Sequence, residues 1–115
     1  MKRYIAALLC SSIILASASV AQDTRTAELA LYNRRLNTTY RTLMQQLGPQ
    51  DQAALRTAQR AWIIFRDADC VAGIGDHRDC LAQRTDDREK QLRESTYWNQ
   101  KGELISLPEP PENHL

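Results

Sequence analysis

The chain has 115 residues, and its 15 Lys and Arg residues nearly balance its 14 Asp and Glu residues, giving a formal net charge of +1. This length is typical of one small domain rather than several. A nucleic-acid-binding domain normally shows a clear basic excess, and this chain has none, so we exclude nucleic acid as a partner.

The start of the chain has the pattern of a cleaved secretory signal peptide. Two basic residues follow the initial Met, and residues 5–16 are mostly apolar, a stretch too short to span a bilayer. Small residues at positions 19 and 21, three and one before the cut, favour cleavage before Gln22, with cleavage after Ala18 as the alternative. We therefore expect residues 1–21 to be removed and the mature protein to be periplasmic or secreted, without a membrane span.

Removal of residues 1–21 changes both the charge and the cysteine content. Two basic residues and no acidic residue are lost, so the mature chain has 13 basic and 14 acidic residues and a net charge of −1. Cys10 is lost as well, and the bulky residue before it argues against a lipid-anchored cysteine. Cys70 and Cys80 remain, and an even pair in an exported chain is expected to form a disulfide.

Residues 23–47 are predicted to form the first helix. This stretch lacks Pro and Gly, and apolar residues recur in it every three or four positions, as on one face of an amphipathic helix. These residues are Leu29, Tyr32, Leu36, Tyr40, Leu43 and Leu47. Gly48 and Pro49 end the helix, and so short a connection predicts that the first two helices pack as an antiparallel hairpin.

The second helix is predicted to begin at Pro49 or Gln50 and to continue to about Val71. We expect it to be the central and most buried helix, because apolar residues occupy one broad side of it. That side comprises Leu55, Ala58, Trp62, Phe65 and Asp69, widened by Ala54, Ala61, Ile64 and Ala68. Two glycines and an acidic residue then predict a turn over residues 72–76.

A third helix is predicted to begin between Asp76 and Asp79 and to run to about Trp98. Its inner face is weakly marked by Leu81, Thr85, Arg88 and Leu92. Cys70 would then lie at the end of one helix and Cys80 at the start of the next. The disulfide is therefore expected to clamp the loop between them.

The predicted fold is all-α, a small three-helix antiparallel bundle with one disulfide. A signal peptide at residues 1–21 precedes the helical domain at residues 22–101. Residues 102–115 are rich in Pro, so we expect a flexible, disordered tail there. Its apolar residues would be free to dock a partner, and they are Leu104, Ile105 and Leu107.

Charged and apolar residues are most densely mixed in the second predicted helix, at residues 59–70. Trp62 and Arg66 are four positions apart, so the guanidinium can stack on the indole ring. Arg66 and Asp67 could form a charged pair poised in a pocket, or an ion pair that orients the helices beside the disulfide. The second interpretation is favoured, because partly buried charges need partners whether or not they take part in chemistry.

Residue spacing argues against an enzyme, a metal site and a cofactor. An EF-hand loop begun at Asp67 lacks its required Gly, because the chain has Ala72 at that position. Cys70, His77 and Cys80 could form a zinc trio, but thiols in an oxidising compartment pair with each other first. The two histidines of the chain do not accompany a free nucleophile, and a domain this small offers no obvious sugar cleft.

A pattern in the second predicted helix is shared with a known family. Residues 58–62 read Ala-Gln-Arg-Ala-Trp, and residues 66–70 read Arg-Asp-Ala-Asp-Cys. This pattern resembles the LprI-type lysozyme-inhibitor family of small exported bacterial proteins, from about Ala27 to Leu92. The motif residues in this chain are Gln59, Arg60, Trp62, Arg66, Asp67, Thr85 and Arg88. Many relatives carry a further N-terminal cysteine pair, which this chain lacks.

The resemblance implies a non-enzymatic protein that binds a protein partner, lysozyme, in the cell envelope. Lysozyme is cationic and has acidic catalytic residues in a cleft, so inhibition would be steric and electrostatic. In the loop clamped by the disulfide, His77 and Arg78 could donate to carboxylates. The candidate binding residues are Gly73, Ile74, Gly75, Asp76, His77 and Arg78. The alternative is an envelope or stress module that binds a different periplasmic protein through a helical face.

Overall fold

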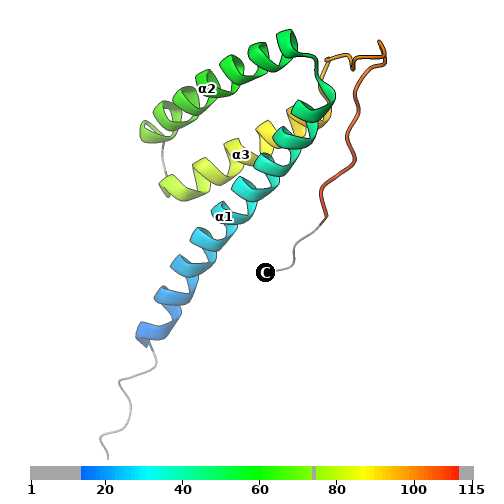
Figure 1. The fold of residues 1–115 in the computed structure, drawn as a ribbon. Coiled ribbons are helices and arrows are strands. Elements are labelled where there is room, and N and C mark those ends of the chain that lie inside the picture. Colours follow the sequence, from blue (N-terminus) through cyan, green and yellow to red (C-terminus); the bar gives the residue numbers. More distant parts are fainter. Residues whose placement is uncertain (1–13, 74, 112–115) are drawn as a thin grey trace, which may run out of the picture.

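The computed structural model describes residues 14–73 and 75–111 and contains three helices (Figure 1). They are α1 (Ile14–Gln46), α2 (Pro49–Val71) and α3 (His77–Arg93). The predicted all-α fold is confirmed, since the described residues contain an isolated β-bridge but no strand. In the same part of the chain, no helix combines the length and the apolar character needed to cross a lipid bilayer.

The first helix is longer at its N-terminal end than the sequence predicts. The predicted helix begins at residue 23, whereas α1 begins at Ile14 and so includes the last part of the predicted signal peptide. Residues 14–22 contain neither Pro nor Gly, which explains why the helix continues through them. The rest of the predicted signal peptide, residues 1–13, lies outside the described residues.

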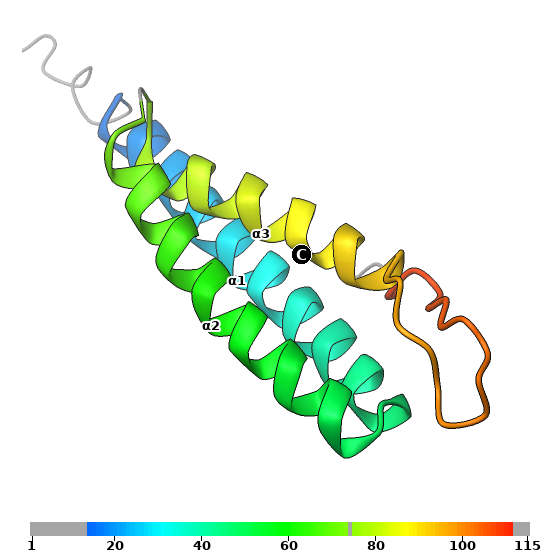
Figure 2. The same cartoon turned by 90° about the horizontal axis from the view of Figure 1, so that it is seen from above.

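The three helices pack side by side, with α2 antiparallel to α1 and α3 running in the same direction as α1 (Figures 1 and 2). α3 packs extensively along α1 and less extensively against α2. The direction of the predicted hairpin is therefore correct. The predicted packing of this hairpin is wrong, because α1 packs mainly against α3 rather than against α2.

The core combines residues from all three helices with residues from the segment after α3. Its buried members are Leu36, Leu43, Leu47, Leu55, Leu92, Ile105 and Leu107. Half-buried Tyr40, Met44, Trp62 and Tyr97 pack against them. Leu36 and Leu43 of α1, and Leu47 directly after it, belong to the apolar stripe predicted for the first helix, so that stripe faces the core as expected.

The expectation that the second helix is the most buried is wrong. Leu55 and Cys70 are the buried residues of α2, whereas Ile64 is 72% exposed and Phe65 is 59% exposed. The side of α2 that faces the bundle consists of Leu55, Gln59, Trp62, Arg66 and Cys70. Apolar periodicity misplaced this side, because two polar residues on it form hydrogen bonds to α3.

The third helix begins where the sequence predicts but ends earlier. Asp76 is the N-cap of α3 and accepts a hydrogen bond from the backbone N–H of Arg78 at 2.8 Å. The sequence predicts an end near Trp98, whereas α3 ends at Arg93. An isolated antiparallel bridge joins Trp98 to Leu104. The β-branched and aromatic residues that follow α3 favour this extended backbone over a helix.

The segment after α3 folds back onto the bundle (Figure 1). The backbone N–H of Ile105 donates to the carbonyl of Tyr97 at 3.0 Å, and that of Leu107 donates to the last residue of α3 at 3.3 Å. The expectation of a free apolar tail is therefore wrong for Ile105 and Leu107, because both side chains complete the core. Residues 112–115 lie outside the described residues.

Candidate functional site

A disulfide joins the C-terminal end of α2 to the N-terminal part of α3. The sulfur atoms of Cys70 and Cys80 are 2.08 Å apart, and their Cα atoms are 5.6 Å apart. The predicted disulfide is confirmed. It uses both thiols of the zinc trio considered with His77, and it fixes the two ends of the intervening loop relative to each other.

The Asp76 carboxylate organises this loop. Its Oδ1 accepts hydrogen bonds from the backbone N–H and Nε of Arg78 at 2.8 and 3.1 Å, and its Oδ2 accepts one from Nη2 at 3.0 Å. Arg25 of α1 adds an ion pair at 3.4 Å. The hydrogen bonds from the side chain and backbone of Arg78 hold the pKa of Asp76 far below its ordinary value. The Asp76 carboxylate in turn raises the pKa of Arg78.

The predicted partner-binding residues lie at the end of the bundle where α2 meets α3. Gly73, Gly75 and His77 are exposed, and Ile74 lies outside the described residues. Gly75 has a φ of 111°, a backbone conformation that favours Gly. The Nδ1 atom of His77 is 3.2 Å from the carbonyl oxygen of Cys70, so the ring is anchored to the end of α2.

The Arg78 side chain is held by groups within the protein. Its Nε and Nη2 donate to Asp76, and its Nη1 donates to the Thr26 hydroxyl of α1 at 3.2 Å. The sequence pointed to Arg78 as a donor for partner carboxylates. In the structure, these bonds make Arg78 a link between the loop and α1.

Five of the motif residues meet between α2 and α3. The Arg66 guanidinium lies 5.1 Å from the centre of the Trp62 ring and donates to the Thr85 hydroxyl at 3.3 Å. The Arg88 guanidinium lies 5.9 Å from the same ring, and its Nε donates to Oε1 of Gln59 at 3.0 Å. Burial in this position lowers the pKa of Arg88. The cluster therefore joins the two helices through polar and cation–π contacts.

The other two motif residues, Arg60 and Asp67, lie outside this cluster and are exposed. Asp67 accepts a hydrogen bond from Nε of the neighbouring Arg66 at 2.9 Å and forms an ion pair with its Nη2 at 2.8 Å. Arg66 thus bridges α2 to α3 through its side chain, whereas the Asp67 carboxylate faces solvent. A further ion pair, between Arg84 and Asp69 at 2.8 Å, ties α3 to α2 near the disulfide.

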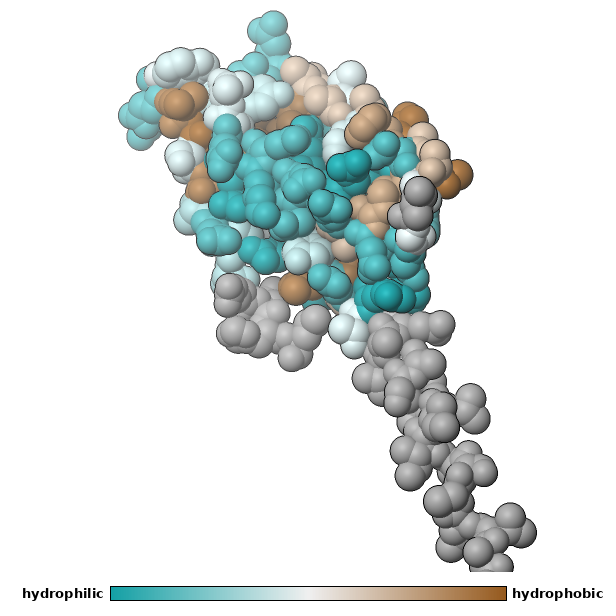
Figure 3. Space-filling model, turned by 180° about the vertical axis from the view of Figure 1, so that it is seen from behind, coloured by the Kyte–Doolittle hydropathy of each residue, from teal (hydrophilic) through white to brown (hydrophobic). Residues whose placement is uncertain are grey.

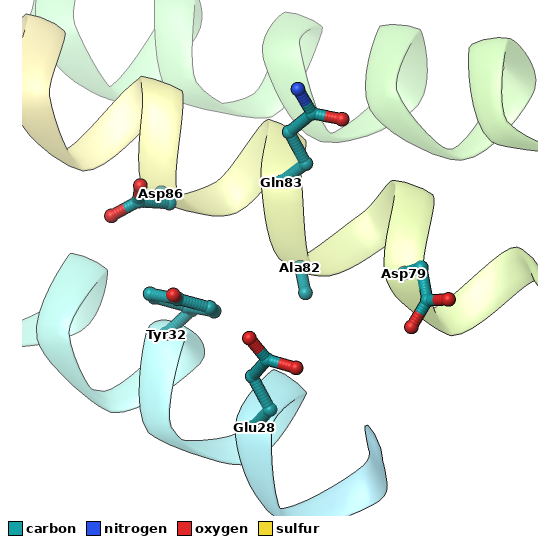
Figure 4. A pocket seen from close by; sticks show the side chains of 6 residues that line it. All are labelled: Glu28, Tyr32, Asp79, Ala82, Gln83 and Asp86. Carbon is teal, nitrogen blue, oxygen red and sulfur yellow. The ribbon is translucent and has the colours of Figure 1, made fainter.

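An acidic groove between α1 and α3 was not anticipated from the sequence (Figure 4). It has a volume of about 270 Å³ and is lined by Glu28, Tyr32, Asp79, Ala82, Gln83 and Asp86. Figure 4 shows Glu28 and Tyr32 on α1 facing the α3 residues across the groove. The spacing of these residues could have indicated the groove. Glu28 and Tyr32 are one helical turn apart, and Asp79 and Asp86 are two turns apart, so each pair lies on one face of its helix. Asp79 lies in the first turn of α3, so the groove adjoins the clamped loop.

Glu89 is a buried carboxylate on the side of α3 that packs against α1. Its side chain is 1% exposed, and its Oε1 accepts hydrogen bonds from the Thr39 hydroxyl and from Nε of Arg93, both at 2.8 Å. Both partners are protein groups, so this carboxylate serves the packing of α3 against α1 rather than the binding of a ligand.

The family model described as "Lysozyme inhibitor LprI" matches residues 16–92, which is more than half of the chain. No curated protein and no solved structure matches this chain. The matched residues include α2, the disulfide and most of α1 and α3. The family description names an inhibitor rather than an enzyme. The chain belongs to the LprI family.

Proposed function

We propose that this protein is exported by a signal peptide at residues 1–21 and inhibits lysozyme in the cell envelope. The family match over residues 16–92 carries the proposal, because the family description names that activity. The protein acts by binding to another protein, without a cofactor and without catalysing a reaction.

The binding element we propose is the clamped loop at residues 73–78. A loop whose ends are already fixed by a disulfide loses little conformational freedom on binding, which favours affinity. Gly73 and Gly75 have no side chains, and so keep the loop narrow, and His77 is exposed beside them. A narrow loop with fixed ends suits insertion into a cleft. There it would keep the polysaccharide away from the two carboxyl groups that cleave it.

The acidic groove beside the loop supports this proposal through its charge. Lysozyme is cationic, and opposite potentials on two proteins raise the rate at which they associate. Asp79 and Asp86 are each paired with a basic residue of this chain, Arg25 and Lys90 respectively. Glu28 forms no ion pair with any described residue, so its charge is the least compensated in the groove.

The direct test is the lysis of a peptidoglycan suspension by lysozyme, followed as loss of turbidity. We expect the purified, oxidised protein to slow clearing in proportion to the amount added. Unchanged clearing at a molar excess of the protein would refute the proposed function.

Two substitutions test the proposed surface. His77→Ala alters the exposed part of the loop, and Glu28→Lys reverses a charge in the groove, so each should weaken protection. Glu103→Lys is the matched control, because it also reverses a carboxylate, in this case an exposed one. Glu103 belongs to the segment after α3, and Figure 1 shows this segment leaving α3 at the end of the bundle opposite the clamped loop. Equal weakening by Glu103→Lys and Glu28→Lys would assign the effect to net charge rather than to the groove.

A further inference from the structure

α2 presents an apolar surface to solvent on the side opposite the bundle, which we call the outer face. Val71 is 77% exposed, Ile64 is 72% exposed and Phe65 is 59% exposed. Figure 3 shows apolar colouring gathered on the side where α2 lies, beside a broad hydrophilic area. Large apolar side chains gathered on one surface commonly mark a contact with another molecule.

The outer face has the spacing of a coiled-coil seam. Six of its residues follow one another at alternating intervals of three and four positions. These residues are Ala54, Thr57, Ala61, Ile64, Ala68 and Val71. All six are exposed. Such a heptad spacing keeps one stripe of a helix facing another helix along its whole length. Within the described residues, neither α1 nor α3 covers this stripe.

We propose that the outer face pairs with the same face of a second copy, as an antiparallel helix pair related by a two-fold axis. In one register every small residue meets a larger one. Ala61 faces the partner's Ile64, Ala68 faces the partner's Thr57, and Ala54 faces the partner's Val71. Because the two-fold axis repeats each contact, the face is complementary to itself, as a symmetric dimer requires.

The charged residues beside the seam support the same register. Arg60 and Asp67 flank one side of it, seven positions apart. In the antiparallel register Arg60 lies next to the partner's Asp67, and the symmetric pair repeats this contact. On the other side of the seam Phe65 covers the partner's Ala58. A parallel pair would instead place Arg60 beside the partner's Phe65, so charge complementarity selects the antiparallel arrangement.

This pairing shares no residue with the clamped loop at residues 73–78 or with the acidic groove. The acidic groove is formed by α1 and α3, and the outer face of α2 points away from the bundle. The dimer therefore stands independently of the proposed function, and each copy keeps its own groove. Since the seam spans residues 54–71 and includes small side chains, we expect a reversible dimer whose population depends on concentration.

The first test is sedimentation equilibrium of the purified, oxidised protein over a series of concentrations. We expect a monomer–dimer equilibrium for the wild type, weakened about a hundredfold or more by Ile64→Asp, because a carboxylate would be buried in the seam. Leu104→Asp is the matched control, since Leu104 is an exposed apolar residue outside the outer face, and it should leave the equilibrium unchanged. Circular dichroism checks that each variant is folded. A wild type that stays monomeric, or a dimer unaffected by Ile64→Asp, would overturn the proposal.

The second test examines the register by reversing charge. Arg60→Asp and Asp67→Arg each place two like-charge pairs across the seam and should weaken self-association by about tenfold. The double variant Arg60→Asp/Asp67→Arg again places opposite charges next to each other across the seam, so it should recover the wild-type equilibrium. Mixing the two single variants should likewise give a heterodimer, because each copy then meets opposite charges on the other. Failure of both the double variant and the mixture to recover association would overturn the antiparallel register.

Discussion

Glu89 is a buried charge whose role can be tested by a single substitution. Its carboxylate receives hydrogen bonds from Thr39 on α1 and from Arg93 on α3. Glu89→Ala leaves the Arg93 guanidinium without this partner, and we expect it to lower the free energy of unfolding by about 3 kcal/mol. Urea unfolding followed by circular dichroism measures the change.

The control for Glu89 is Asp87→Ala, which removes an exposed carboxylate from the same helix. This substitution should change the free energy of unfolding by less than about 0.5 kcal/mol. Similar losses in the two variants would show that helix propensity or net charge, rather than the buried hydrogen bonds, explains the effect.

Asp76 should make the stability of the protein depend on pH. Its pKa in the folded protein is lowered by the hydrogen bonds from Arg78, so its contribution is complete above the ordinary pKa of Asp, about 4. As the pH falls below that value, the unfolded chain takes up the proton first and the contribution is progressively lost. We expect the wild type to melt at a higher temperature than Asp76→Asn near neutral pH, with a difference that shrinks below pH 4. Asn can still cap α3, so the comparison isolates the charge. A difference that stays constant across this pH range would contradict the assignment.

At the residue scale, the sequence predicts which residues form bonds and caps better than it predicts which side of a helix faces the core. The disulfide partners, an Asp N-cap for α3 and the stacking of Arg66 on Trp62 follow from residue type and spacing, and the structure contains all three, with Asp76 rather than Asp79 as the N-cap. The inward position of Gln59 does not follow, because a polar residue can face a helix neighbour only if a partner such as Arg88 lies opposite. That pairing depends on tertiary contacts between distant parts of the chain.

Among the elements, the segment after α3 differs most from expectation, and two adjacent residues in it test its role. Ile105 is 3% exposed in the core, whereas Leu104 is 58% exposed. Ile105→Ala should lower the free energy of unfolding by about 3 kcal/mol, because it leaves a cavity in the core. Leu104→Ala should lower it by less than about 0.5 kcal/mol. Chemical unfolding of both variants gives the comparison, and equal values would mean that the segment is not packed.

The disulfide is an element-scale constraint between α2 and α3. Cys70 and Cys80 are ten positions apart, and closing a loop of this length stabilises the folded state by about 3 kcal/mol in the chain-entropy model. Adding reductant should therefore lower the unfolding midpoint of the wild type. The double variant Cys70→Ser/Cys80→Ser should start at the lower midpoint and be insensitive to reductant. A midpoint that falls equally in both proteins would attribute the loss to the reagent.

Helix boundaries are predictable where a residue with a strong local preference marks them. Pro49 and Asp76 mark the starts of α2 and α3, and both helices begin where the sequence predicts. The end of α3 at Arg93 lacks such a residue, and contacts between residues 97–107 and the core decide it. The same long-range packing explains why residues with the composition of a flexible tail become part of the fold.

For the whole molecule, the distribution of charge predicts how inhibition should depend on salt. If the groove around Glu28 attracts a cationic enzyme, the association rate should fall as ionic strength rises, while the dissociation rate changes less. Surface plasmon resonance at several salt concentrations separates the two rates. The monomeric variant Ile64→Asp should show the same dependence, because the outer face and the groove lie on different sides of the bundle. An association rate that does not respond to salt would exclude electrostatic attraction as the cause.

Ile105 and Leu107 follow all three helices in the sequence, which has a consequence for the order in which the core is assembled. They are synthesised after the helices, and until they are present the core leucines of α1 and α3 lack part of their apolar surroundings. The native core is thus completed only after residues 105–107 have been synthesised. A precursor that we propose to be exported benefits from this delay, because a polypeptide has to remain unfolded to be threaded across a membrane.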